Sequence, residues 1–70
     1  MADVEAEMVA NVWKILVAPG ATVNEGDTLV ILESMKMEIP VVSPQAGTVT
    51  SVNVVEGGVV QEGDVIAVVE

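Results

Sequence analysis

The sequence predicts a small all-β domain, a sandwich or flattened barrel whose two halves are related by a pseudo-twofold axis. Val and Ile supply 21 of the 70 residues, and such β-branched side chains are stiff at χ1 and suit a pleated strand. Short apolar segments alternate with Gly and Pro turn signals along the chain, which is typical of small sandwiches and barrels. The third observation is an internal repeat, in which residues 10–33 resemble residues 47–70.

The repeat has an offset of 37 residues and eight identities in 24 aligned positions. The identical pairs are Val12/Val49, Val17/Val54, Gly20/Gly57, Val23/Val60, Glu25/Glu62, Gly26/Gly63, Asp27/Asp64 and Glu33/Glu70. A solenoid needs roughly three or more copies to bury a continuous core. We therefore expect the two halves to close on each other within one domain that spans residues 1–70.

Strands are expected in the apolar segments between the turns, at residues 11–17, 28–32, 38–42, 48–54 and 65–69. Val12 is out of phase with Ile15 and Val17, and its repeat partner Val49 shares this break, which predicts a bulge or bend in both strands. The chain is short and has no cysteine for disulfides. We therefore expect nearly every valine to point inward.

Residues 28–38 contain several good helix formers, and Pro40 would end a helix there. The repeat favours a strand instead, because the counterpart of this segment is Val-Ile-Ala-Val-Val. The chain must then reverse near residues 34–37. A two-residue hairpin turn needs positive φ at both positions and favours Asn-Gly, so a Met35-Lys36 turn would carry strain of about 1–3 kcal/mol per residue. We interpret this tip as kept for a function.

The repeat also predicts where the tip lies. Shifted by 37 residues, Lys36 corresponds to a position beyond either end of the chain. The tip and the termini should therefore lie at opposite poles of the domain. Nothing in the sequence indicates a second cation or an apolar pocket that would activate this lysine as a base or a Schiff-base former. An exposed amine that another enzyme acylates is the chemistry that this placement favours.

The inventory of side chains excludes most other functions. The chain has no His, Cys or Arg and a net charge of −9, so thiolate or histidine catalysis, ordinary zinc or copper sites and nucleic-acid binding are not expected. The spacing of a calcium loop is absent, and Asp27 and Asp64 are expected to bond local amides in turns. The acidic first residues resemble no leader, and the longest apolar run, 65–69, is too short for a membrane span. A cytoplasmic protein without a membrane partner is expected.

The segment Glu33-Ser34-Met35-Lys36-Met37-Glu38 resembles the attachment motif of the biotinyl domains, which usually reads Ala-Met-Lys-Met. Residues 12–15, 23–27 and 42–49 are also similar to that family, and the resemblance covers about residues 8–70. Three departures are visible. Ser34 replaces the usual alanine, Ala10-Asn11 stands where many relatives have a glycine that Gly47 keeps in the second half, and no "thumb" segment is inserted.

The resemblance implies a barrel-sandwich hybrid, which is a flattened β-barrel or sandwich of two four-stranded antiparallel sheets with the hairpin exposed. It implies that a biotin protein ligase biotinylates Lys36, and that Glu33, Ser34, Met35, Met37 and Glu38 are the neighbours in the modification motif. The biotin would act as a swinging arm that carries a carboxyl group between a biotin carboxylase and a carboxyltransferase, both acting in trans. The chain itself would be a monomeric carrier and not an enzyme.

Two alternative functions remain open at this stage. A lipoyl domain has the same fold and presents a lysine in the same way, usually within Asp-Lys-Ala, so modification by a lipoyl ligase, or by both ligases, is compatible with the fold. The chain could also be a small β-sandwich interaction module in which Lys36 is incidental. A separate alternative concerns Met35 and Met37, which could pack on one face and fill the core. Of the remaining candidates, Lys14 is expected to be a solvated strand residue, and Trp13 a half-exposed packing residue.

Overall fold

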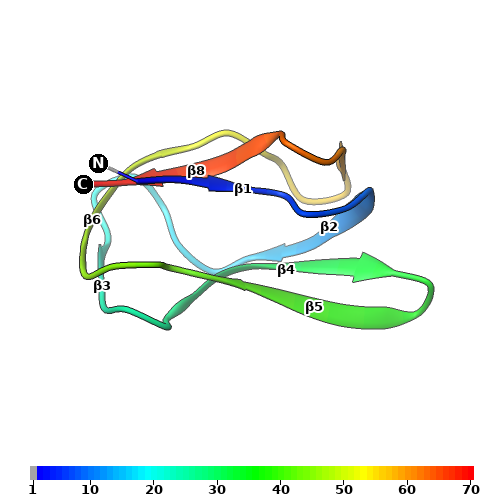
Figure 1. The fold of residues 1–70 in the computed structure, drawn as a ribbon, viewed down its shortest axis with the longest axis horizontal. Helices are drawn as coiled ribbons and strands as arrows, with labels where there is room; N and C mark the ends of the chain where they lie inside the picture. The colour runs from blue at the N-terminus through cyan, green and yellow to red at the C-terminus, as the bar shows by residue number, and fades with distance from the viewer. Residues whose placement is uncertain (1) are drawn as a thin grey trace.

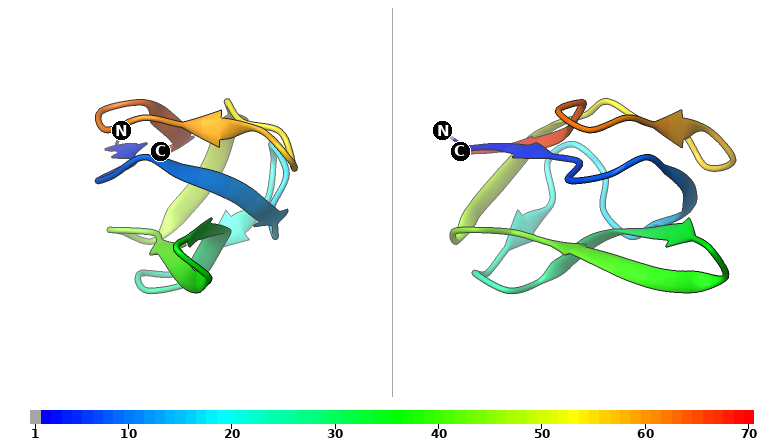
Figure 2. Two further views of the ribbon diagram at one scale, coloured as in Figure 1. Left: turned by 90° about the vertical axis from the view of Figure 1, so that its right-hand side faces the viewer. Right: turned by 45° about the vertical axis from the view of Figure 1, so that its right-hand side comes forward.

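The computed structural model describes residues 2–70 and contains two four-stranded antiparallel sheets. The first sheet has the order β1-β8-β6-β3 and the second the order β5-β4-β2-β7 (Figure 1). The strands are β1 (Ala2–Glu5), β2 (Ala10–Ile15), β3 (Thr22–Val23), β4 (Thr28–Ser34), β5 (Met37–Val42), β6 (Gly47–Val52), β7 (Val59–Val60) and β8 (Val65–Val69). The predicted all-β architecture is confirmed, and Figure 2 shows its two layers from two further directions.

The two sheets are copies of each other under the 37-residue offset. The shift turns β5, β4, β2 and β7 into β1, β8, β6 and β3, which is the observed order of the other sheet. Hydrogen bonds outside the ladders repeat as well: the Leu16 amide donates to the Leu29 carbonyl at 2.9 Å, and the Asn53 amide to the Ile66 carbonyl at 2.8 Å. The repeat read from the sequence is therefore a pseudo-twofold relation in space.

The predicted irregularity in the first strand of each half is also present. The register of β2 against β4 shifts between Val12 and Lys14, and that of β6 against β8 shifts between Val49 and Ser51. Such a bulge bends a strand and increases its twist. The two equivalent bends help each sheet to curve over the shared core.

The Gly-Asp turns of both halves have the predicted role. Gly26 has φ 88° and Gly63 has φ 89°, a region that glycine reaches without penalty. The following aspartates accept a hydrogen bond from the amide three residues earlier: Asp27 Oδ2 from Asn24 at 2.8 Å and Asp64 Oδ2 from Gln61 at 2.9 Å. The turns are thus fixed locally, which sets the direction in which β4 and β8 begin.

The core lies between the sheets, but the expectation that nearly every valine points inward is wrong. Only seven of the 17 valines are buried, and four of them are at least 44% exposed. The buried valines are Val4, Val12, Val23, Val30, Val49, Val60 and Val69, and the exposed ones are Val9, Val42, Val55 and Val59. Val42 and Val59 face solvent because a two-layer sandwich has one interior face per sheet, so residues of the other parity in a strand point outward. Val9 and Val55 lie in connecting segments outside the strands.

The expected strand limits also need correction. β2 ends at Ile15 and β6 at Val52, two residues earlier than expected, because Val17 and Val54 pack against the core from connecting segments. The residues alone did not predict β1, β3 and β7. Two of these have only two residues each, and β1 alternates apolar residues with Asp3 and Glu5, so none presents an apolar run.

The domain is elongated, with extents of 31 × 17 × 17 Å. Figure 1 shows both termini at one end and the β4–β5 hairpin projecting from the other end, which confirms the predicted placement of the tip. Among residues 2–70 the structure has no helix that is long and apolar enough to cross a membrane.

Candidate functional site

The candidate site is the turn that joins β4 and β5. The two strands stay paired to the last residue, with Ser34 opposite Met37 and Glu33 opposite Glu38. This pairing leaves Met35 and Lys36 as a two-residue turn, with φ 53° and φ 65°. Positive φ at both positions is the requirement of a type I′ turn, which Asn and Gly normally meet. The strained, glycine-free turn expected from the sequence is therefore present.

The side chains at the tip are exposed. Met35 is 91% and Met37 65% exposed, and Lys36 is exposed as well. The hairpin extends past the end of the sandwich, where no opposite sheet can cover it (Figure 1). The alternative in which the two methionines fill the core is therefore wrong, and their apolar surface is available to a partner.

Two acidic residues flank the tip. Glu33 and Glu38 lie directly opposite each other across β4 and β5, and both are exposed. Like charges at facing positions destabilise a strand pair. The hairpin thus combines two locally unfavourable features, an unusual turn and a facing acid pair, with one projecting amine.

The sequence of this chain matches a known protein family. Residues 1–69 match the biotin/lipoyl family that is described as biotin-requiring enzyme. The chain belongs to the biotin/lipoyl attachment family. It is an attachment domain of the kind that serves as a carrier, and its fold and its Met-Lys-Met hairpin agree with that membership.

Two relatives are about as long as this attachment domain. The biotinylated protein TB7.3 homolog of Mycobacterium leprae is 54% identical over 67 residues, which cover 96% of this chain and 94% of the relative. The biotin/lipoyl attachment protein of Bacillus subtilis is 46% identical over 63 residues, which cover 90% and 86%. A solved structure, the urea carboxylase of Kluyveromyces lactis, superposes with a TM-score of 0.92 at 32% identity. The match covers 99% of this chain but only 6% of the carboxylase chain.

The two lysines of the attachment domain differ in their surroundings. The Lys14 ammonium lies over the Trp13 ring, 5.5 Å from its centroid, on the outer face of the second sheet. This is within the range of a cation–π interaction. Lys14 is exposed and Trp13 is 44% exposed, as expected from the sequence. Lys36 instead stands at the end of the hairpin, with the chain turning beneath it.

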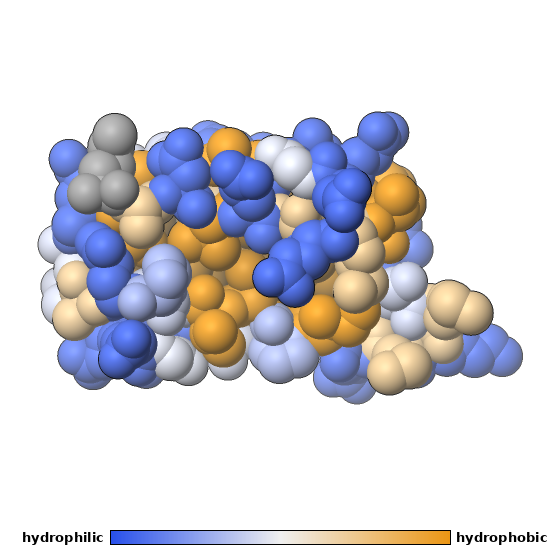
Figure 3. All heavy atoms as spheres, in the orientation of Figure 1, coloured by the Kyte–Doolittle hydropathy of each residue, from blue (hydrophilic) through white to orange (hydrophobic). Residues whose placement is uncertain are grey.

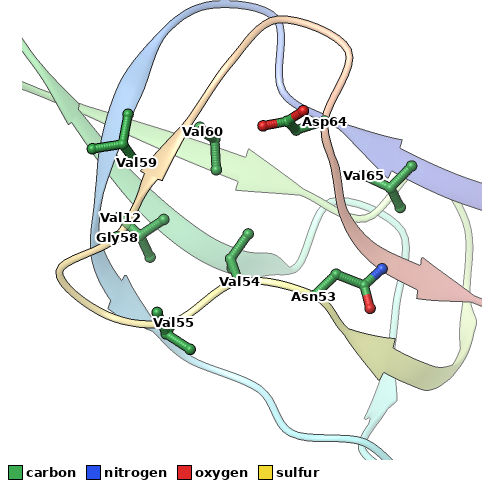
Figure 4. A pocket seen from close by; sticks show the side chains of 9 residues that line it. All are labelled: Val12, Asn53, Val54, Val55, Gly58, Val59, Val60, Asp64 and Val65. Carbon is green, nitrogen blue, oxygen red and sulfur yellow. The ribbon is translucent and has the colours of Figure 1, made fainter.

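The attachment domain also has two hollows on its sides. One lies between β1 and β5, with a volume of about 370 Å³, and Figure 3 shows hydrophobic atoms gathered along it between hydrophilic borders. Asp3, Glu5 and Glu7 contribute to its lining from the β1 side, and prolines and valines do so from the β5 side. The other hollow, of about 350 Å³, lies beside β7 and is lined mostly by valines (Figure 4).

The hairpin residues were predictable from the sequence, whereas three apolar residues exposed on or beside the same sheet were not identified from it. Leu16, Val42 and Val59 are 51%, 44% and 64% exposed. A usable signal was present, because the repeat aligns these residues with Asn53, Glu5 and Thr22. Apolar residues that the other half replaces with polar ones are not required by the shared fold.

Proposed function

We propose that this attachment domain is a biotin carboxyl carrier and that Lys36 is the residue biotinylated by a biotin protein ligase. In this proposal the modified domain passes a carboxyl group from a biotin carboxylase to a carboxyltransferase in trans, as a cytoplasmic monomer of one domain, residues 1–70. The observation that supports the proposal is the two-residue Met35-Lys36 turn, with positive φ at both residues, at the tip of the projecting β4–β5 hairpin.

The residues present fit covalent attachment through an amide. The Lys36 side chain is exposed, so the active site of a second protein can reach its amine. Nζ attacks the carbonyl carbon of an activated biotin, the new C–N bond replaces the bond to the leaving group, and Nζ loses its proton to the ligase or water. Biotin attached in this way supplies a ureido nitrogen that can hold a carboxyl group.

The chain's own contribution to carboxyl transfer is mechanical. Pairing of β4 with β5 along their whole length holds the base of the arm in one place. The four-carbon stem of Lys36 is flexible beyond that base. A tethered group reaches two successive active sites at a high effective concentration without dissociating. A rigid hairpin with a flexible stem is suited to this task, and it needs no catalytic group from the carrier.

A lipoyl carrier, or a carrier that accepts both cofactors, is the second candidate. It is supported by the shared fold and by the similarity to a relative named for both attachments. The exposed Met35 and Met37 favour biotin, because lipoyl domains usually carry Asp before and Ala after the modified lysine. The same hairpin geometry serves either cofactor.

The test is the intact mass of the purified chain after incubation with biotin, lipoate and both ligases, followed by peptide mapping. A biotin increment on Lys36 that Lys36→Arg abolishes, and that Lys14→Arg leaves unchanged, supports the proposal. A lipoyl increment on Lys36 would replace the cofactor and keep the site. An increment on Lys14 would refute the site, and an unmodified chain beside active control domains would favour an interaction module.

A further inference from the structure

Apolar exposure is confined to one of the two sheets. Among the strands of residues 2–70, the large hydrophobic residues classed as exposed, Trp13, Met37, Val42 and Val59, all belong to the sheet β5-β4-β2-β7. Leu16, directly after β2, is 51% exposed as well. Val59 on β7 is 64% exposed, and it lines the hollow beside β7 together with Val60 (Figure 4). The sheet that exposes these residues is the one that carries the Lys36 hairpin.

Three of these residues, Trp13, Leu16 and Val42, lie in a band across the outer side of that sheet, together with the exposed Pro40 and the half-buried Ile31. Lys14, beside Trp13, pairs with Ile31, which pairs with Pro40, so one row crosses β2, β4 and β5. The next row away from the hairpin contains Leu16, whose amide bonds to Leu29, and Val42, which pairs with Thr28. We define the apolar band by its five residues: Trp13, Leu16, Ile31, Pro40 and Val42.

The pseudo-twofold relation provides an internal control for this band. The equivalent row in the other sheet is Ser51, Val68 and Asp3, with the same pairing. The residues equivalent to the band, in the same order, are Thr50, Asn53, Val68, Asp3 and Glu5. The same backbone therefore tolerates Thr, Asn, Asp and Glu at four of the five positions, and folding does not require apolar residues there. Contiguous exposed apolar surface of this kind marks an interaction site.

The position of the band relative to Lys36 indicates its occupant. Pro40 lies on β5, four residues after Lys36 in the turn, so the two residues are about 13 Å apart at roughly 3.3 Å per strand residue. A protein–protein interface of ordinary size covers about 800 Å² on each partner and extends farther than this. An enzyme that acts on the Lys36 amine must approach within the reach of its four-carbon stem. An enzyme that acts at the far end of an attached cofactor stays farther from the strands.

The charges around the band define the partner's chemistry. The Glu33–Glu38 pair lies between the band and the turn, and the chain has a net charge of −9. Lys14, which lies over Trp13, is the one cation beside the band among residues 2–70. A complementary surface places an apolar patch against the band and Lys or Arg side chains toward the acidic pair. Opposite charges of this kind steer association and fix the register of the complex.

We propose that the apolar band is the docking surface for the ligase that modifies Lys36. This inference rests on the proposed function, because it requires that a ligase acts at Lys36. It adds that the ligase recognises the face of the sheet β5-β4-β2-β7 behind the hairpin and not the hairpin alone. The band aligns the domain so that Lys36 enters the active site, and the opposite sheet stays free.

The test transfers the equivalent residues from the other half onto the band. The variant carries four substitutions: Trp13→Thr, Leu16→Asn, Pro40→Asp and Val42→Glu. Each new residue already occupies the equivalent position in the sheet β1-β8-β6-β3. Its kcat/KM as a ligase substrate is expected to fall by about tenfold or more, mainly through KM, because central apolar anchors carry most interface energy. Folding is checked by circular dichroism and thermal melting. If this variant fails to fold, the neutral pair Trp13→Thr, Leu16→Asn replaces it.

A matched control adds the same two charges elsewhere. Ala18→Glu with Ala46→Asp places them on exposed connecting residues outside the band, and kcat/KM is expected to stay within about twofold, since such rim charges contribute little. An unchanged KM for a folded band variant, with the wild type fully modified, overturns the inference and leaves the proposed function intact. A wild type that neither ligase modifies overturns both. A wild-type dimer by sedimentation that the variant loses, with KM unchanged, would assign the band to a second copy and also overturn the inference.

Discussion

Replacing the Met35-Lys36 turn by Asn-Gly, through Met35→Asn with Lys36→Gly, is expected to stabilise the domain while it removes the proposed attachment lysine. In the wild-type turn, Met35 and Lys36 have φ values in the left-handed region, 53° and 65°. That region costs roughly 1–2 kcal/mol for each residue with a Cβ, and less for Asn. Met35 is 91% exposed, so its removal sacrifices little packing.

The net gain follows from two opposing contributions. Relief at both positions stabilises the folded state by about 2–3 kcal/mol. The new glycine increases the entropy of the unfolded chain, which costs about 0.5–1 kcal/mol. We expect the free energy of unfolding to rise by about 1–2 kcal/mol, and Tm to rise by roughly 5–15 °C for a domain of this size.

The assay is thermal and urea unfolding, followed by circular dichroism and by the fluorescence of Trp13, the only aromatic residue of the chain. The matched control moves the same pair two residues along the hairpin, as Met37→Asn with Glu38→Gly. These positions lie in β5 without positive φ, so Tm should fall. An unchanged or lower Tm for the turn variant would refute the view that this turn is retained at a cost in stability.

Four further predictions concern two turns, the start of β6 and the choice of cofactor. Gly26→Ala should lower the unfolding free energy by about 1 kcal/mol through φ alone, since no atom lies within 4 Å of a Cβ built there. Gly47→Ala should lower the free energy of unfolding by more than Gly26→Ala does, because its Cβ would collide with the backbone carbonyl of Glu70. Equal losses of unfolding free energy for the two variants in urea titrations would contradict this. Asp64→Ala should lower the free energy of unfolding by about 1 kcal/mol, because it removes the turn hydrogen bond from the Gln61 amide. An unchanged thermal melting curve would contradict this. Met35→Asp with Met37→Ala should shift modification toward lipoate, and an unaltered ratio of biotinyl to lipoyl mass increments would show that these neighbours do not discriminate.

The hairpin shows why the repeat was more informative than local propensity. Residues 28–38 contain strong helix formers, and a local reading would have left helix and strand undecided. The counterpart Val65–Val69 is apolar and β-branched, and the structure pairs both segments as β4 and β8 in equivalent sheets. The same offset predicted that Lys36 lies opposite the termini. Symmetry therefore conveyed tertiary information that a single window of sequence does not contain.

The exposed apolar residues show the limit of the sequence analysis. By residue type alone, Val42 and Val59 would be predicted to lie in the core, yet both are more than a third exposed. Strand parity determines which face each side chain takes, and parity changes at every bulge. Register shifts occur between Val12 and Lys14 and between Thr28 and Val30, so alternation counted from one end of β2 or β4 assigns the wrong face at the other end.

The sequence by itself determined the fold class, the twofold organisation, the Gly-Asp turns and the lysine at the hairpin tip. These features follow from local chemistry and from the repeat: β-branched content, glycine's access to positive φ, and an amine without a counterpart in the other half. The tertiary structure alone decided which apolar residues are buried. Burial depends on the register between strands distant in sequence, and this register placed the apolar band on the outer face of the sheet that presents Lys36.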